Sequence, residues 1–271
     1  MRNLIDLQQC VRPTHRRGGI PSVALLAGIL TLITGMSDVG ADPGADIIRV
    51  GAFAQATPGG RLPTGWQLVK ISDVVPSQFS LVNSDGSTVV RIDAGDSAAS
   101  ISRTLQVDPA MYPYLRWRWR ISNLVAKANI HRKQGDDFPA RLYVLFDYPT
   151  DRLSLADRVK LVIARAVYGD RVPAAALCYV WDGSSKTGTT VWSAYTDRVR
   201  LIVVRGQGEP VGHWVDEERN LVDDFQAAFG ERPPEISGVA IAADTDQTAE
   251  TVTSWFGDIW LSAQPGGAGD R

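Results

Sequence analysis

Residues 115–121 read LRWRWRI, a strict alternation of apolar and basic side chains. Successive side chains of a β-strand point to opposite faces, so the stretch predicts a strand with one tryptophan and aliphatic face and one arginine face. Two tryptophans among aliphatic residues belong in a core between sheets. Three arginines cannot be buried without partners, so their face is either solvated or matched with carboxylates. The stretch therefore predicts a sheet that covers a core on one side only.

Strand-like periodicity recurs along most of the chain, with Gly, Pro, Asn and Asp turn signals between the segments. An isolated sheet must cover its apolar face with another layer. The pattern therefore predicts a mainly β fold, a two-sheet β-sandwich of jelly-roll type. The predicted strands are 47–53, 66–71, 79–83, 88–94, 99–107, 115–123, 141–147, 175–181, 199–205, 238–243 and 254–261.

Two amphipathic segments predict helices at the rim of the sandwich. Residues 153–167 carry apolar side chains at helical spacing. Residues 217–229 follow Asp216 as an N-cap and end at Gly230, a suitable residue just past a helix. No repeat or linker divides the chain, so residues 42–271 are predicted to be one domain, with its ordered core at about 47–262.

The first 41 residues have the three parts of a secretory signal peptide. Four arginines within residues 2–17 precede the uncharged apolar stretch 20–33, and small residues follow up to a predicted cleavage after Ala41. The apolar stretch is shorter than the roughly 20 residues needed to span hydrocarbon. We therefore expect a periplasmic or secreted protein with no membrane span after signal cleavage.

Composition restricts the classes of function. A net charge of −2 favours neither nucleic acid nor a membrane surface as partner. Of the two cysteines, Cys10 leaves with the signal peptide, so no intrachain disulfide can form. Cys178 lies in an apolar run and is expected to be a buried structural thiol.

Three predicted strands carry polar faces that would merge into one surface if the strands were neighbours. Arginine forks bind carboxylates or pairs of hydroxyls, and aromatic rings stack on sugars, so this surface predicts a site for a glycan or another small polar ligand. The alternative is a network of structural salt bridges. Two tryptophans beside the polar loop 182–190 are candidate stacking platforms. The predicted ligand-binding residues are Arg116, Arg118, Arg120, Arg141, Tyr143, Asp147, Trp181 and Trp192.

No catalytic motif is complete. The chain has no G-x-S-x-G elbow, phosphate loop or H-E-x-x-H, and only His131 and His213 follow the signal peptide. We therefore expect binding rather than catalysis. Two alternatives stay open: a scaffolding role in an envelope complex, and polysaccharide hydrolysis by paired carboxylates drawn from Asp136, Asp137, Asp147, Asp244, Asp246 and Asp258.

Four segments occur in a distinctive order: WRW at 117–119, GDDFPARLYV at 135–144, YTDRV at 195–199 and WFGDI at 255–259. Together they resemble an exported bacterial family catalogued as domain of unknown function 3047. The resemblance covers about residues 47–261 and implies a periplasmic or secreted protein with no assigned activity.

The closing strand, over residues 255–261, is also similar to the last strand of galactose-binding-like jelly rolls, many of which place a late Asp in a structural calcium site. This similarity implies Asp258 as a calcium ligand. Asp136 and Asp137 offer further oxygen ligands, or pair with the arginines instead. No cofactor other than calcium is expected.

Overall fold

The computed structural model describes residues 46–71, 73–153, 158 and 174–266. All described residues belong to one unit, Val39–Arg271. The predicted signal peptide lies outside the described residues, as does the helix predicted at 153–167 except Leu153 and Arg158. Within the described part of the chain, no helix is both long and apolar enough to cross a bilayer.

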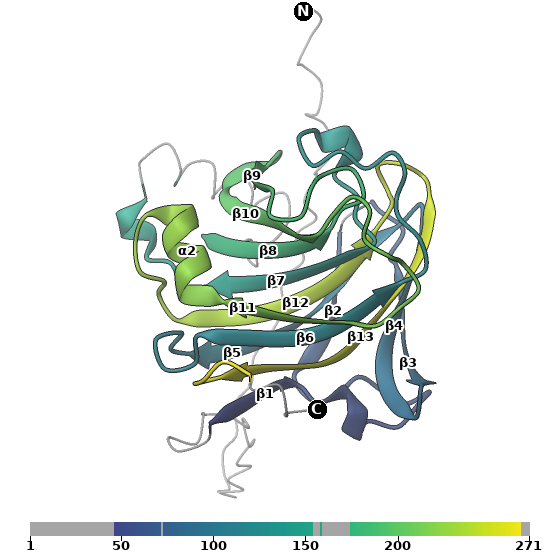
Figure 1. Cartoon of the computed structure of the whole chain (residues 1–271), viewed down its shortest axis with the longest axis horizontal. Coiled ribbons are helices and arrows are strands. Elements are labelled where there is room, and N and C mark those ends of the chain that lie inside the picture. Colours follow the sequence, from purple (N-terminus) through teal and green to yellow (C-terminus); the bar gives the residue numbers. More distant parts are fainter. Residues whose placement is uncertain (1–45, 72, 154–157, 159–173, 267–271) are drawn as a thin grey trace, which may run out of the picture. The chain divides into compact units, whose positions relative to one another are not determined.

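Two β-sheets make up the domain (Figure 1). The first, sheet A, contains β1 (Ile47–Gly51), β3 (Gln78–Ser84), β4 (Ser87–Gly95), β6 (Tyr114–Ile121), β11 (Val215–Asn220) and β13 (Thr251–Ser262). The second, sheet B, contains β2 (Trp66–Lys70), β5 (Ala98–Val107), β7 (Ala140–Phe146), β8 (Ala175–Trp181), β9 (Thr190–Ser193), β10 (Thr196–Arg205) and β12 (Ile236–Asp244). The helical elements are η1 (Phe53–Gln55), η2 (Lys133–Gly135), η3 (Thr150–Arg152) and α2 (Leu221–Phe229).

The strand order within each sheet follows from backbone pairing. Sheet A runs β11-β6-β13-β4-β3, with β1 beside β13, and sheet B runs β2-β5-β12-β7-β8-β10-β9. Neighbours are antiparallel except β8 and β10, which are parallel. All eleven predicted strands are present, and the chain crosses repeatedly between the sheets. The mainly β, two-sheet sandwich is therefore confirmed.

The core lies between the two sheets, where the alternation of residues 115–121 places it. Trp117 and Trp119 are buried, and their rings lie 5.3 Å from Tyr179 and 5.8 Å from Trp181 on sheet B. Side chains from both sheets form one buried cluster. Burial of such aromatic side chains stabilises a fold by roughly 2–3 kcal/mol each, so this cluster holds the layers together.

The helix predicted at 217–229 begins later than expected. Residues 215–220 form β11, which pairs with β6 and sets Glu218 opposite Arg116. The N-cap is Asn220, whose Oδ1 accepts hydrogen bonds from the N–H groups of Val222 and Asp223. Asp216 is therefore a strand residue, because pairing with β6 outweighs the local helical pattern. The predicted end is confirmed: Gly230 adopts φ 76°, the left-handed conformation that closes a helix.

Candidate functional site

The residues predicted to share one polar surface lie on two different sheets. Arg116, Arg118 and Arg120 belong to β6 in sheet A, whereas Arg141 and Tyr143 belong to β7 in sheet B. Both sets point away from the common core, so they occupy opposite outer faces of the sandwich. The expectation of one merged surface is wrong, because alternation along a strand indicates its face but not its sheet.

The arginines of β6 differ in their partners. Arg116 is buried and its Nε donates to Glu218 at 2.6 Å. Arg120 lies between the rings of Trp214 and Trp255, at 5.1 and 4.3 Å, and 3.7 Å from a carboxylate oxygen of Asp85. These two arginines are therefore part of a charge and cation–π network.

Arg118 is the exception on this face. Its guanidinium lies 4.8 Å from the Trp214 ring centroid, and within the described residues it forms no ion pair and no side-chain hydrogen bond. It is half-buried and lines a groove of about 540 Å³ on the outer face of sheet A. The predicted residues Arg116 and Asp258 line the same groove.

Arg141 is enclosed by protein rather than open to a ligand. It is 3% exposed, lies 4.4 Å from the Phe138 ring, and binds the carboxylates of Asp136 and Asp244. These carboxylates raise the pKa of Arg141 against the opposing effect of burial. Its predicted role in ligand binding is corrected to a structural one, because the loop before β7 covers the guanidinium.

The outer face of sheet B carries a groove of about 640 Å³, and two further predicted residues, Tyr143 and Asp147, line it. Backbone pairing places Gln67, Ser102, Ala240 and Tyr143 side by side on four adjacent strands. The small side chains of Ser102 and Ala240 therefore form the floor of the groove. The side-chain amide of Gln67 lies on one side of them and the phenol of Tyr143 on the other. Burial raises the pKa of Tyr143, so its hydroxyl stays protonated, and the hydroxyl oxygen accepts a hydrogen bond from Nη1 of Arg141 at 3.3 Å.

The two predicted stacking tryptophans differ in accessibility. Trp181 is fully buried against Trp119, because alternation along β8 turns it inward with Leu177 and Tyr179. Its role as an exposed platform is therefore corrected. Trp192 is 36% exposed, but its ring contacts Phe229 and the Arg200 guanidinium, and it lines neither groove.

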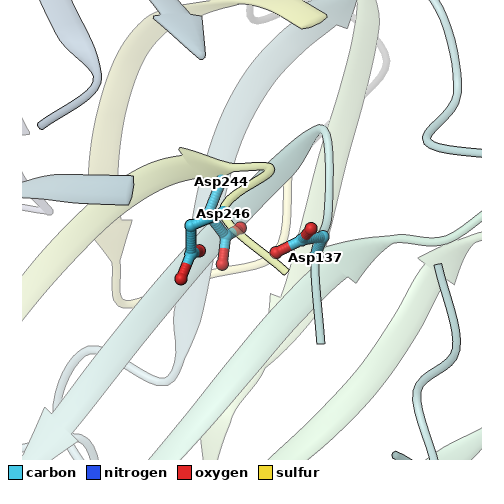
Figure 2. A group of neighbouring side chains, drawn as sticks. All are labelled: Asp137, Asp244 and Asp246. Atoms are coloured by element: carbon cyan, nitrogen blue, oxygen red, sulfur yellow. The ribbon is translucent and has the colours of Figure 1, made fainter. Parts of the chain in front are cut away.

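The predicted calcium ligands are not brought together. Asp136 and Asp137 precede β7, whereas Asp258 lies on β13 and accepts the N–H of Ala54 at 2.8 Å. Figure 2 shows a different group, in which Asp137 faces Asp244 and Asp246, with carboxylate oxygens within 4.8 Å of one another.

Protein donors already engage this aspartate group. Arg141 binds both oxygens of Asp244, and the N–H groups of Gln247 and Thr248 bind Asp137. Burial raises the pKa of Asp137, and it raises that of Asp244 to about 7 although Arg141 lowers it. Calcium binding stays a prediction, at Asp136 and Asp137 or at Asp258 separately, because Asp258 belongs to the other sheet.

The aspartate group of Figure 2 and the thiol of Cys178 lie outside both grooves. Asp137, Asp244 and Asp246 line neither groove, so they form no substrate cleft there. Cys178 is buried, as expected, and desolvation raises its pKa, which disfavours the nucleophilic thiolate. Sequence reasoning missed Gln67, Ser102 and Ala240 in one groove and Asp216 in the other, since small or isolated polar residues give no motif.

The family described as "Protein of unknown function (DUF3047)" matches residues 64–260. The chain belongs to this family. The resemblance carried by the WRW, GDDFPARLYV, YTDRV and WFGDI segments is thereby confirmed. No curated protein matches this DUF3047 chain in sequence.

Several solved structures are distantly similar to this DUF3047 protein. The Endo-D glycoside hydrolase domain of Streptococcus pneumoniae R6 is 10% identical over 74% of this chain and 22% of that chain, with a TM-score of 0.32. The module CBM27-1 of Caldicellulosiruptor saccharolyticus is 6% identical over 82% of this chain and 100% of that chain, with a TM-score of 0.34. The Emp46p carbohydrate recognition domain is 10% identical over 80% of this chain and 97% of that chain, with a TM-score of 0.36. Such scores establish neither a shared fold nor a shared ligand, and the architecture rests on the strand pairing itself.

Proposed function

We propose that this protein binds a linear, uncharged glycan along the groove on the outer face of sheet B. The observation that carries the proposal is the extent of the groove, whose lining residues run from Gln67 and Val69 on β2 to Val199 on β10. Five strand spacings separate these edges in the sheet order, or about 24 Å at ~4.8 Å per strand. A groove that long suits a polymer better than a compact metabolite.

The chemistry of the groove supports a neutral sugar chain. Ser100, Ser102 and Thr104 offer hydroxyls from β5, and the Tyr143 phenol combines a flat apolar face with a polar tip. The one arginine among the described lining residues, Arg103, is held against the protein through its Nη1, which donates to the backbone carbonyls of Arg49 and Val50. A ligand with alternating hydroxyls and apolar ring faces matches such a surface.

The distribution of carboxylates favours binding over hydrolysis. Asp147 is the single carboxylate among the described residues that line the groove. Hydrolysis by the usual mechanisms needs a pair of carboxyl groups on either side of the scissile bond. No second carboxylate lines the groove among the described residues, so a non-catalytic binding role is the function that it supports best.

The test is affinity electrophoresis of the 42–271 protein in gels containing glucan, mannan or xylan, followed by titration with the corresponding hexasaccharides. Ser102→Trp fills the floor of the groove from a half-buried surface position and is expected to weaken binding at least tenfold. Ser80→Trp places the same side chain on an exposed position of β3 in sheet A and is expected to bind normally. Unretarded wild-type protein in all gels, or equal binding by both variants, would refute the proposal.

We propose further that the protein is exported and acts in the periplasm or outside the cell, from the signal-like composition of residues 1–41. A fusion of these residues to alkaline phosphatase lacking its own signal should give periplasmic activity, with cleavage after Ala41. Two arginines introduced into the apolar stretch 20–33 should keep the enzyme in the cytoplasm. Cytoplasmic retention of the unmodified fusion would contradict export.

A further inference from the structure

The groove on the outer face of sheet A carries a separate set of binding groups. Most of its lining residues come from β11, β6 and β13, which are adjacent strands of sheet A (Figure 1). It lies on the face of the sandwich opposite the proposed glycan groove and shares no lining residue with it. A ligand bound here would therefore leave the groove of sheet B accessible.

Arg118 lies at the middle of this surface. Asp216 of β11 is its direct neighbour on one side, and on the other β13 bulges between Phe256 and Ile259. Gly257 at the bulge lets the arginine lie across the strand, because an added Cβ would come within 2.5 Å of Nε. The side chain is thus positioned by packing on Gly257 and Trp214, while its N–H groups have no protein acceptor among the described residues.

Two carboxylates with unused oxygens accompany this arginine. Asp216 is exposed and has no hydrogen-bond or ion-pair partner within the described chain. Asp258 is half-buried, and only its Oδ1 is used, by the N–H of Ala54. Trp260, directly opposite Arg116 in the strand register, is a further lining residue of the same groove.

These groups together select a neutral polyhydroxylated ligand. Carboxylates accept hydrogen bonds from hydroxyls, the arginine fork donates to hydroxyl oxygens, and an indole offers a flat apolar face. Carboxylates outnumber arginines in the lining, since Asp216, Glu218 and Asp258 accompany Arg116 and Arg118, while Glu217 pairs with Arg205. That balance disfavours an anionic ligand such as a uronate or sulfated sugar.

We infer that the groove of sheet A is a second saccharide site, which takes a single neutral sugar unit through Arg118, Asp216 and Asp258. Its occupancy does not depend on the groove of sheet B. One consequence does rest on the proposed function: with both grooves filled, one protein molecule bridges two glycan strands, because the grooves lie on opposite faces.

The test is a saturation-transfer NMR titration of the 42–271 protein with the methyl glycosides of glucose, galactose and mannose, and with methyl galacturonide as the anionic probe. At least one neutral glycoside is expected to bind, and galacturonide at least several-fold more weakly. Asp216→Asn and Arg118→Lys are expected to weaken binding at least tenfold, and Asp216→Asn is an exposed change that leaves packing intact. Their matched controls, Asp223→Asn on α2 and Arg132→Lys, change exposed residues outside the groove and are expected to bind normally.

Failure of this site and failure of the sheet B groove give different results. Ser102→Trp should keep monosaccharide binding while it loses the hexasaccharide, and Asp216→Asn should do the reverse. If no neutral glycoside binds the wild-type protein, or if both groove variants bind as well as their controls, the second site is refuted.

Bridging has its own test, in which the wild-type protein should make a dilute solution of soluble polysaccharide turbid. Ser102→Trp and Asp216→Asn each keep one groove, so each should bind without causing turbidity. Turbidity that persists in both variants would refute bridging.

Discussion

Trp119 packs in the core and also hydrogen-bonds a carboxylate at the edge of the core. Its ring packs between Trp181 and Phe256, at 5.8 Å from each, and its Nε1–H donates to Glu217 at 3.0 Å. Burial raises the pKa of Glu217, although hydrogen bonds from Arg205 and Trp119 lower it. One residue thus contributes apolar packing and keeps a buried carboxylate satisfied.

Replacing Trp119 should therefore have a large cost. Trp119→Ala is expected to lower the free energy of unfolding by about 3–5 kcal/mol, because it leaves a cavity between the sheets. Urea denaturation followed by far-UV circular dichroism measures the change. Trp192→Ala, at a 36% exposed position, is the control and should cost under about 1 kcal/mol. Similar losses in the two variants would contradict this assignment of the core.

Asp244 should make stability depend on pH. Its folded pKa is about 7, raised by burial, whereas an unfolded Asp titrates near ~3.9. The folded state therefore holds a proton that the unfolded chain releases, and stability falls as pH rises from about 4 to about 7. Asp244→Asn should flatten that fall by up to about 1.4 kcal/mol per pH unit in urea titrations. An unchanged slope in Asp244→Asn would show that the site stays ionised.

At the scale of elements, the junction between β11 and α2 shows how pairing overrides local pattern. Glu217, Glu218 and Arg219 would be compatible with a helix, yet they pair in register with Trp117, Arg116 and Leu115 of β6. This pairing places Glu218 beside Arg116, with which it forms an ion pair. It also places Asp216, Glu217 and Glu218 along one side of the sheet A groove. The helix then starts only at the residue after Asn220.

The cap should be measurable on its own. Asn220→Ala removes the oxygen that accepts from the N–H groups of Val222 and Asp223 and is expected to cost about 1 kcal/mol. Asn220→Asp keeps an acceptor at the helix N-terminus and should cost much less. Thermal unfolding of the two variants compares them directly; equal melting temperatures would mean that tertiary contacts alone hold the start of α2.

At the scale of the whole domain, the two sheets share one buried cluster that also includes Leu221 and Phe225 of α2. Neither sheet could cover its apolar face alone, so we expect the 42–271 protein to unfold in one transition. Tryptophan fluorescence and far-UV circular dichroism should give coincident curves in urea. Two separated transitions would indicate that sheet A and sheet B are independently stable.

The sequence by itself determined eleven of the thirteen strands, the two-layer architecture and the inward face of Trp117 and Trp119, because alternation is a local property of an extended backbone. It also indicated Arg116, Arg118, Tyr143 and Asp147 as ligand-binding residues of one surface, and these four line two separate grooves. It could not indicate β9, which is only four residues long, or β11, whose charged residues show no alternation of apolar and polar side chains.

Only the tertiary structure decided which strands share a sheet. The position of β6 and β7 in different sheets separated Arg118 from Tyr143, and the approach of Asp244, 103 residues away in sequence, enclosed Arg141. The floors of both grooves likewise come from residues that are distant in the chain and chemically ordinary. Pairing between strands is a long-range choice set by burial of the whole core, so no single segment encodes it.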